Sequence, residues 1–210
     1  MKPIKYIFLV MIMNKYLEFL NQNITLSSDE VQLLNNNLNQ KHFQKGETIH
    51  HCEHIHDGIY FIESGTARGY YIDENGKDTT WYIYFNDENS HLTNLVVFDY
   101  DSYLNQTPSK LHFEALSDCS VWIMKKKDIE YLCSQYLKWS EFMRRSSDMA
   151  YSLVHQKYFT QLVQNAEERF AEFLIKTPYL LHKVPQYHIA SYLGITPQHL
   201  SRLKKINKCK

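Results

Sequence analysis

The sequence predicts an α+β protein with an N-terminal β-roll of the jelly-roll type, one long helix, and a small C-terminal helix-turn-helix domain. Apolar residues change from helical spacing to two-residue spacing near Phe43 and return to helical spacing after Lys125. No glycine or proline occurs between Tyr136 and Leu162, so an unbroken helix of roughly 40 Å is expected there. Two short helical patterns around a glycine follow near the C-terminus. We place the domain boundaries at 14–133, 134–163 and 164–210.

The N-terminal residues 14–40 are predicted to be helical, with Ser28 as an N-cap and Val31, Leu34 and Leu38 on one face. An apolar run from Ile7 to Met13 precedes them, and it is far too short to cross a bilayer. We expect this run to be a helix start, or residues upstream of a misassigned start codon. No membrane partner is expected.

The β-roll is predicted from short strands separated by turn residues. "GIYFIESGTARGYYIDENGKDTTWYIYF" contains three strands, with a turn at Gly65 and a hairpin at Asn75-Gly76. The runs "KLHFEAL" and "CSVWIMK" supply two more strands. Strands this short and evenly spaced are typical of a barrel or roll.

The long helix has an imperfect seven-residue apolar repeat. Phe142, Met149 and Gln156 form one series, and Ser146, Leu153 and Thr160 form another. Such a seam can pair with a second copy of the chain. It can equally lie on the β-roll of its own chain, and the spacing leaves both arrangements open.

The segment "VPQYHIASYLGITPQHLSRLKKI" predicts the helix-turn-helix. Gly194 stands where the first helix ends, a position that commonly adopts the left-handed backbone conformation and favours glycine. Thr196 can cap the second helix, and Pro197 suits its first position. Leu200 and Leu203 then face inward, and the outer face is polar and basic.

A polar helix of this kind can read DNA in the major groove. Arg202 can donate two hydrogen bonds to a guanine, and Gln198 can read an adenine edge in the same way. Lysines of the helix suit phosphates. The predicted DNA-binding residues are Thr196, Gln198, His199, Ser201, Arg202, Lys204 and Lys205.

The charge distribution agrees with a nucleic-acid partner at the C-terminal end. The formal net charge is zero, but residues 173–210 contain seven lysines and arginines and no acid, so residues 1–172 carry −7. A basic end on an acidic body is typical of nucleic-acid binding. Four cysteines lie far apart without a C-x-x-C pair, which fits reduced thiols in the cytoplasm.

The helix-turn-helix, with Leu193-Gly194-Ile195-Thr196 and Leu200-Ser201-Arg202, resembles the DNA-binding end of the Crp/Fnr family of bacterial transcription regulators. The stretch from "KGETI" through "WYIYF" is similar to that family's cyclic-nucleotide-binding-type β-roll, and the long helix stands where the family has its dimerisation helix. The resemblance implies a homodimer on a two-fold-symmetric double-stranded DNA site, with half-sites roughly 34 Å apart. RNA polymerase and an unknown small-molecule effector are the further partners it suggests.

The resemblance also locates an effector pocket. Members that bind cyclic AMP have a Gly-Glu pair and, about ten residues later, an Arg-Ser pair. Asn86-Asp87-Glu88 stands near the first part without its glycine, and Pro108-Ser109-Lys110 stands near the second without its arginine. The predicted effector-pocket residues are Asn86, Glu88, Ser109 and Lys110, and no response to cyclic AMP is expected, because Lys110 cannot form arginine's bidentate contact.

The alternative function depends on "HHCEHIHDG", from His50 to Gly58. A cupin-like enzyme or metal sensor would use the cluster from His50 to His56 as ligands. His54 and His56 match the two histidines of the cupin motif, but the glycine and glutamate of that motif are missing. We interpret these histidines as solvent-facing residues near a loop, with His50 and Cys52 on one strand face. A ligand-sensing scaffold whose helical end binds a protein is a third hypothesis. No catalytic motif is found, so neither enzymatic activity, a cofactor nor a metal site is expected.

Overall fold

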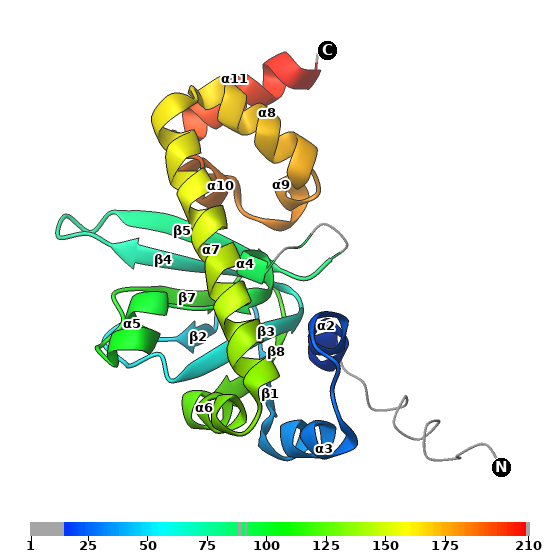
Figure 1. The fold of residues 1–210 in the computed structure, drawn as a ribbon. Helices are drawn as coiled ribbons and strands as arrows, with labels where there is room; N and C mark the ends of the chain where they lie inside the picture. The colour runs from blue at the N-terminus through cyan, green and yellow to red at the C-terminus, as the bar shows by residue number, and fades with distance from the viewer. Residues whose placement is uncertain (1–14, 88–89, 91, 209–210) are drawn as a thin grey trace.

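The computed structural model describes residues 15–87, 90 and 92–208 (Figure 1). The predicted helix start before Met13 and the effector residue Glu88 lie outside these residues. The described chain is a mixed α and β fold, with two packed sheets, a long helix crossing them and a group of helices at the C-terminal end. The predicted fold class is therefore confirmed.

Two four-stranded antiparallel sheets form the β-roll, in the orders β1-β8-β3-β6 and β2-β7-β4-β5. Their inner faces enclose a core that includes Tyr60, Ile62, Phe113, Val121 and Ile123. The strands are β1 (Asn39–Phe43), β2 (Thr48–His50), β3 (Gly58–Ser64), β4 (Thr66–Ile72), β5 (Asp78–Phe85), β6 (Val96–Val97), β7 (His112–Ala115) and β8 (Cys119–Lys125).

The turns follow the sequence signals. Gly65 lies between β3 and β4 with φ +92°, where an added Cβ would lie 2.3 Å from the Asp118 carbonyl oxygen. Gly76, with φ +76°, lies in the β4–β5 hairpin. The first strand was missed, because β1 starts at Asn39 inside the range predicted to be helical. Its sequence, NQKHF, has few of the apolar residues by which a strand is recognised.

Two N-terminal helices, α2 (Lys15–Asn23) and α3 (Ser28–Asn37), pack beside the roll. Ser27, not Ser28, is the N-cap of α3 and forms a capping box with Glu30. The buried Glu30 carboxylate also accepts hydrogen bonds from Trp139 (2.7 Å) and Lys138 (2.5 Å). Burial alone would raise the pKa of Glu30, but these hydrogen bonds outweigh it and lower the pKa to about 2.

The long helix α7 (Leu137–Val163) follows α6 (Lys126–Gln135) and crosses the roll diagonally (Figure 1). One face packs on its own chain, from the buried Trp139 and Phe142 to the partly buried Leu153 and Thr160. Another face is exposed and apolar. It comprises Tyr151, Val154, Tyr158 and Leu162, three or four residues apart. The helix therefore lies on its own domain and also leaves an apolar stripe uncovered.

The remaining helices belong to the C-terminal half or to connections within the roll. Two connecting helices between β5 and β7 were not predicted from the sequence, namely α4 (Leu92–Leu95) and α5 (Tyr100–Asn105). The C-terminal helices are α8 (Ala166–Lys176), α9 (Leu180–Lys183), α10 (Gln186–Tyr192) and α11 (Pro197–Lys208). None of the helices in the described ranges is both long and apolar enough to cross a membrane.

Candidate nucleic-acid interface

Helices α10 and α11 form the helix-turn-helix through local interactions. Gly194 ends the first helix with φ +68°, the left-handed conformation that glycine adopts without strain. The Thr196 hydroxyl accepts a hydrogen bond from the His199 N–H at 3.1 Å, and α11 starts at Pro197. Ile189, Leu200 and Leu203 are buried at the contact between the helices. The sequence-based account of this motif is confirmed at each of these positions.

The outward face of α11 carries the predicted base-reading residues. Gln198, Ser201, Arg202 and Lys205 are exposed. His199 and Lys204 are partly buried, and the Lys204 ammonium donates to Gln186 Oε1 of α10 at 2.9 Å. Lys204 is thus engaged with the first helix, whereas Arg202 and Lys205 are available to a partner.

The helix-turn-helix is docked on the β-roll through one shared hydrophobic core. Ile83 and Phe85 of β5 and Leu116 pack with apolar residues of α8, α10 and α11. Strand β5 is at the edge of the second sheet, and the Ser191 hydroxyl of α10 accepts a hydrogen bond from its Thr80 N–H at 2.8 Å. Helix α10 thus satisfies a donor that an open sheet edge would leave to water.

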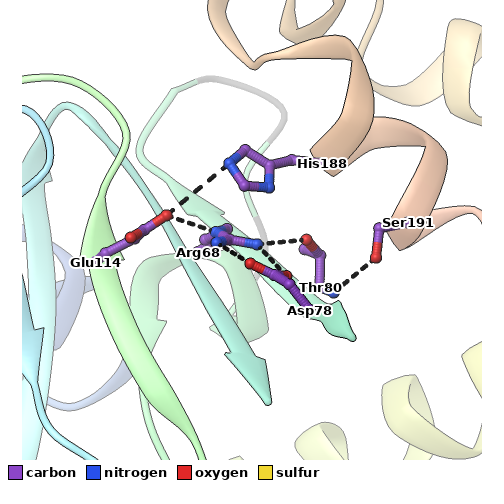
Figure 2. A network of polar contacts seen from close by, with 6 residues as sticks. All are labelled: Arg68, Asp78, Thr80, Glu114, His188 and Ser191. Carbon is purple, nitrogen blue, oxygen red and sulfur yellow. Dashed lines mark hydrogen bonds and ion pairs between the residues drawn. The ribbon is translucent and has the colours of Figure 1, made fainter. Parts of the chain in front are cut away.

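A buried polar network reinforces this contact (Figure 2). The Arg68 guanidinium is 3% exposed; it donates two hydrogen bonds to Asp78 at 2.6 Å and one to Glu114 at 2.7 Å. His188 of α10 lies above it, with Nε2 3.9 Å from Glu114 Oε1. Strands β4, β5 and β7 and helix α10 therefore meet at a single arginine.

Among the described effector-pocket residues, Asn86 and Ser109 bind different partners. Asn86 donates to the Ile62 carbonyl oxygen at 2.8 Å, whereas Ser109 donates to the Asp99 carboxylate at 2.6 Å. Lys110 is exposed. Both Ser109 and Asp99 are buried, and Asp99 also caps α5 by accepting from the Ser102 N–H. The residue that faces Ser109 is therefore Asp99, which was not among the predicted residues, and the effector pocket itself stays a prediction.

Comparison with known proteins agrees with this geometry. Residues 40–136 match the family described as the cyclic nucleotide-binding domain. FixK2 from Bradyrhizobium japonicum is 18% identical over 80% of this chain and 83% of its own, with a TM-score of 0.66. A candidate transcriptional regulator of the Crp/Fnr family from Eubacterium rectale ATCC 33656 is 17% identical over 90% of this chain and 88% of its own, with a TM-score of 0.62. The fold is that of the Crp/Fnr regulators.

A CooA variant from Carboxydothermus hydrogenoformans has the same fold, at 15% identity over 90% of this chain and 82% of its own, with a TM-score of 0.62. No curated protein matches the sequence. The family match covers the β-roll and α6, and the structural likeness extends over α7 and the C-terminal helices.

The sequence predicted that the histidines between His50 and His56 face solvent, but two of them are buried in the β-roll. Strand β2 ends at His50, and the chain turns at Cys52 and Glu53, where Glu53 has φ +67°. His50 and His56 are buried side by side, with ring centroids 4.7 Å apart. Burial lowers the pKa of His56 to about 3, so this ring is neutral at physiological pH.

A metal role gains no support from this arrangement. Among the described residues, histidine, cysteine, aspartate and glutamate side chains do not gather in groups of three that would hold a metal ion. The two rings pack instead with Tyr60 and Phe113 in the domain core.

The docked helix-turn-helix is expected to loosen in acid through His188. Burial, and next the positive charge of Arg68, lower the pKa of His188 to about 4, whereas a released histidine titrates near 6.5. Docking stability is therefore complete above about pH 6.5 and is lost as the pH falls towards 4, by roughly 3 kcal/mol. Thermal melting of the wild type and of His188→Leu between pH 7 and 4 measures this loss by difference, because the buried His56 destabilises both proteins over the same range. His188→Leu should remove it, because leucine does not titrate, whereas the exposed His155→Gln should melt like the wild type; an unchanged acid profile in His188→Leu would contradict the assignment.

Proposed function

We propose that this protein is a DNA-binding transcription regulator of Crp/Fnr type that acts in the cytoplasm as a homodimer on a two-fold-symmetric site. The observation that supports this proposal best is the presentation of α11. Its apolar residues Leu200 and Leu203 are buried, while Gln198, Ser201 and Arg202 are exposed along one face. A helix held by its apolar side with a polar face free can enter a major groove.

The C-terminal end of the chain is basic, and its positive charge favours binding to DNA. Arg202 and Lys205 are exposed, and no acidic residue follows Glu172 in the sequence. A DNA backbone therefore meets positive charge without nearby carboxylates on the same helix. Base contacts from Gln198 and Arg202 would select the sequence, and lysines would contribute affinity without selecting it.

Independence from cyclic AMP is supported by the Asp99–Ser109 contact. In the cassette that the sequence resembles, an arginine about ten residues after a Gly-Glu pair binds the phosphate. Here Ser109 follows Asp99 by ten residues, and the two side chains bind each other at 2.6 Å. A buried carboxylate at this place would repel the phosphate of a cyclic nucleotide, and neither residue supplies a positive charge.

Homodimer formation is supported by the exposed stripe of α7. Tyr151, Val154, Tyr158 and Leu162 are between 41% and 73% exposed in the single chain. Large apolar side chains gathered on one helix face are typical of a partner interface. A two-fold axis along this stripe would pair α7 with α7 of a second copy.

Replacing Tyr158 with glutamate tests the dimer and the function together. A two-fold interface would bring both new charges towards each other without partners, so we expect a monomer and a loss of DNA affinity of at least tenfold. Sedimentation equilibrium and fluorescence anisotropy on an inverted-repeat DNA measure the two effects. Gln135→Glu adds the same charge at an exposed position of α6 and should remain dimeric. A dimeric Tyr158→Glu protein that binds DNA normally would refute the assigned interface.

A further inference from the structure

A cavity of about 620 Å³ lies where α7, β5 and the helix-turn-helix domain meet. Its wall includes Tyr82 of β5, Lys157 and Gln164 at α7, Arg169 and Phe173 of α8, and Tyr192 of α10. Volumes in this range are typical of small-molecule sites. Because all three parts of the fold contribute residues, a bound molecule would contact both domains at once.

Lys157 contributes an ammonium group without a carboxylate partner. Its Nζ donates to the Trp81 carbonyl oxygen and lies 4.3 Å from the ring centroid of Tyr192 and 4.6 Å from that of Tyr82. No carboxylate of the described residues lies within ion-pair distance of it. Burial therefore lowers the pKa of Lys157 to about 7, since no opposite charge offsets the loss of hydration.

Arg169 of α8 is a second cation of the cavity wall that lacks a carboxylate partner among the described residues. Its Nε donates to the Leu193 carbonyl oxygen at 3.0 Å and its Nη1 to the Gln164 carbonyl oxygen at 2.5 Å, and both acceptors are neutral. The acid of the cavity, Glu172, is bound by Lys176 at 2.5 Å and by Gln164 at 3.0 Å. The cavity thus has two cations that no carboxylate of the described chain neutralises.

An unused acceptor and several aromatic rings complete the wall. The Oε1 atom of Gln164 is buried and has no hydrogen-bond partner among the described residues, and a buried acceptor left unpaired is unfavourable. Tyr82, Phe173 and Tyr192 present aromatic surface beside Lys157. These groups would complement an aromatic anion that also carries a hydrogen-bond donor.

We propose that this interdomain cavity binds a small aromatic carboxylic acid carrying a hydroxyl or ring N–H group. The carboxylate pairs with Lys157 and is attracted by Arg169, the ring packs on Tyr82, Phe173 and Tyr192, and the donor meets Gln164. Such a ligand would be the effector of the regulator, and this role alone rests on the proposed function. Binding would fix α10 against α7 and so set the orientation of α11.

Isothermal titration calorimetry with matched acids and amides tests the site. The probes are 4-hydroxybenzoate, 4-hydroxyphenylacetate and indole-3-acetate, each compared with its neutral amide. We expect at least one acid to bind with a Kd below about 1 mM and at least tenfold more tightly than its amide. At pH 8 binding should also take up protons, because the anion restores the charge of Lys157. Equal binding of acids and amides, or no binding by any acid, would overturn the proposal.

Variants separate this site from the rest of the protein. Lys157→Met keeps an apolar stem over the rings and removes the charge, so we expect at least tenfold weaker acid binding and no proton uptake. Lys157→Gln serves as a second variant if melting shows that the first is unfolded. Lys77→Met makes the same change at an exposed position of the β4–β5 hairpin and should bind like the wild type. Arg202→Ala should also bind the acid normally, so a failure of DNA recognition would not mimic a failure of the cavity.

Discussion

Replacing Arg202 with alanine is expected to weaken binding to the specific DNA site by between about fivefold and a hundredfold per half-site, with the fold unchanged. Arg202 is exposed on α11, one turn after Gln198, and does not belong to the core cluster that contains Leu200 and Leu203. A bidentate contact of arginine with guanine contributes about 1–3 kcal/mol of discrimination. Fluorescence anisotropy on the specific site and on a scrambled site measures the change.

The matched control is Lys205→Ala on the same helix. Lys205 is exposed and suits a phosphate, so its loss should weaken binding to the specific and the scrambled DNA alike. The slope of log affinity against log salt concentration should fall by about one, the value for one phosphate contact. Arg202→Ala should instead weaken the specific site more than the scrambled one. A folded Arg202→Ala protein that retains full preference for the specific site would refute the base-reading role.

Replacing Arg68 with methionine is expected to lower the free energy of unfolding by about 3 kcal/mol. Arg68 is buried, whereas the side chains of its partners Asp78 and Glu114 are 40% and 22% exposed. Water can rehydrate Asp78, but Glu114 stays under α10 near His188 with its charge unpaired. Urea denaturation followed by circular dichroism measures the loss.

Lys176→Met provides the control for Arg68→Met. It breaks the ion pair with Glu172 on α8, but the lysine side chain is 67% exposed. Exposed pairs of this kind contribute about 0.3–0.5 kcal/mol, so this variant should unfold nearly like the wild type. If Arg68→Met proved as stable as Lys176→Met, the network in Figure 2 would not hold the two domains together.

The helix-turn-helix was predictable because its signals are local. Gly194, Thr196 and Pro197 each act on neighbouring backbone groups, so their roles follow from a few adjacent residues. The β4–β5 hairpin was predictable for the same reason, since Gly76 supplies the positive φ that the turn needs. Neither prediction requires information about residues that are distant in the sequence.

The interdomain contacts were missed because they join residues that are distant in the sequence. Nothing near Arg68 in the chain indicates that His188 and Ser191 of α10 cover the same sheet edge. Likewise, Lys157 is an ordinary helix lysine until Tyr82 and Tyr192 enclose it. Such groups become visible only when tertiary packing is known.

The contact between Asp99 and Ser109 was missed for a different reason. The sequence contains two acidic stretches before Ser109, one next to Asn86 and one that begins at Asp99, and only Asp99 stands ten residues before Ser109. That spacing was the available signal. The buried histidines were misread because residues near a loop were expected to face solvent. The chain turns at Glu53, whose φ of +67° is unusual for glutamate, and His56 then packs against His50 in the core.

The most direct test of the proposed function is selection of bound sequences from a random DNA pool, with and without cyclic AMP. The proposed homodimer should enrich one inverted repeat with half-sites about one helical turn apart. The Asp99–Ser109 contact predicts equal enrichment without the nucleotide. Enrichment that requires cyclic AMP would contradict the nucleotide independence, and the absence of any enriched sequence in either condition would contradict the central claim that α11 reads DNA.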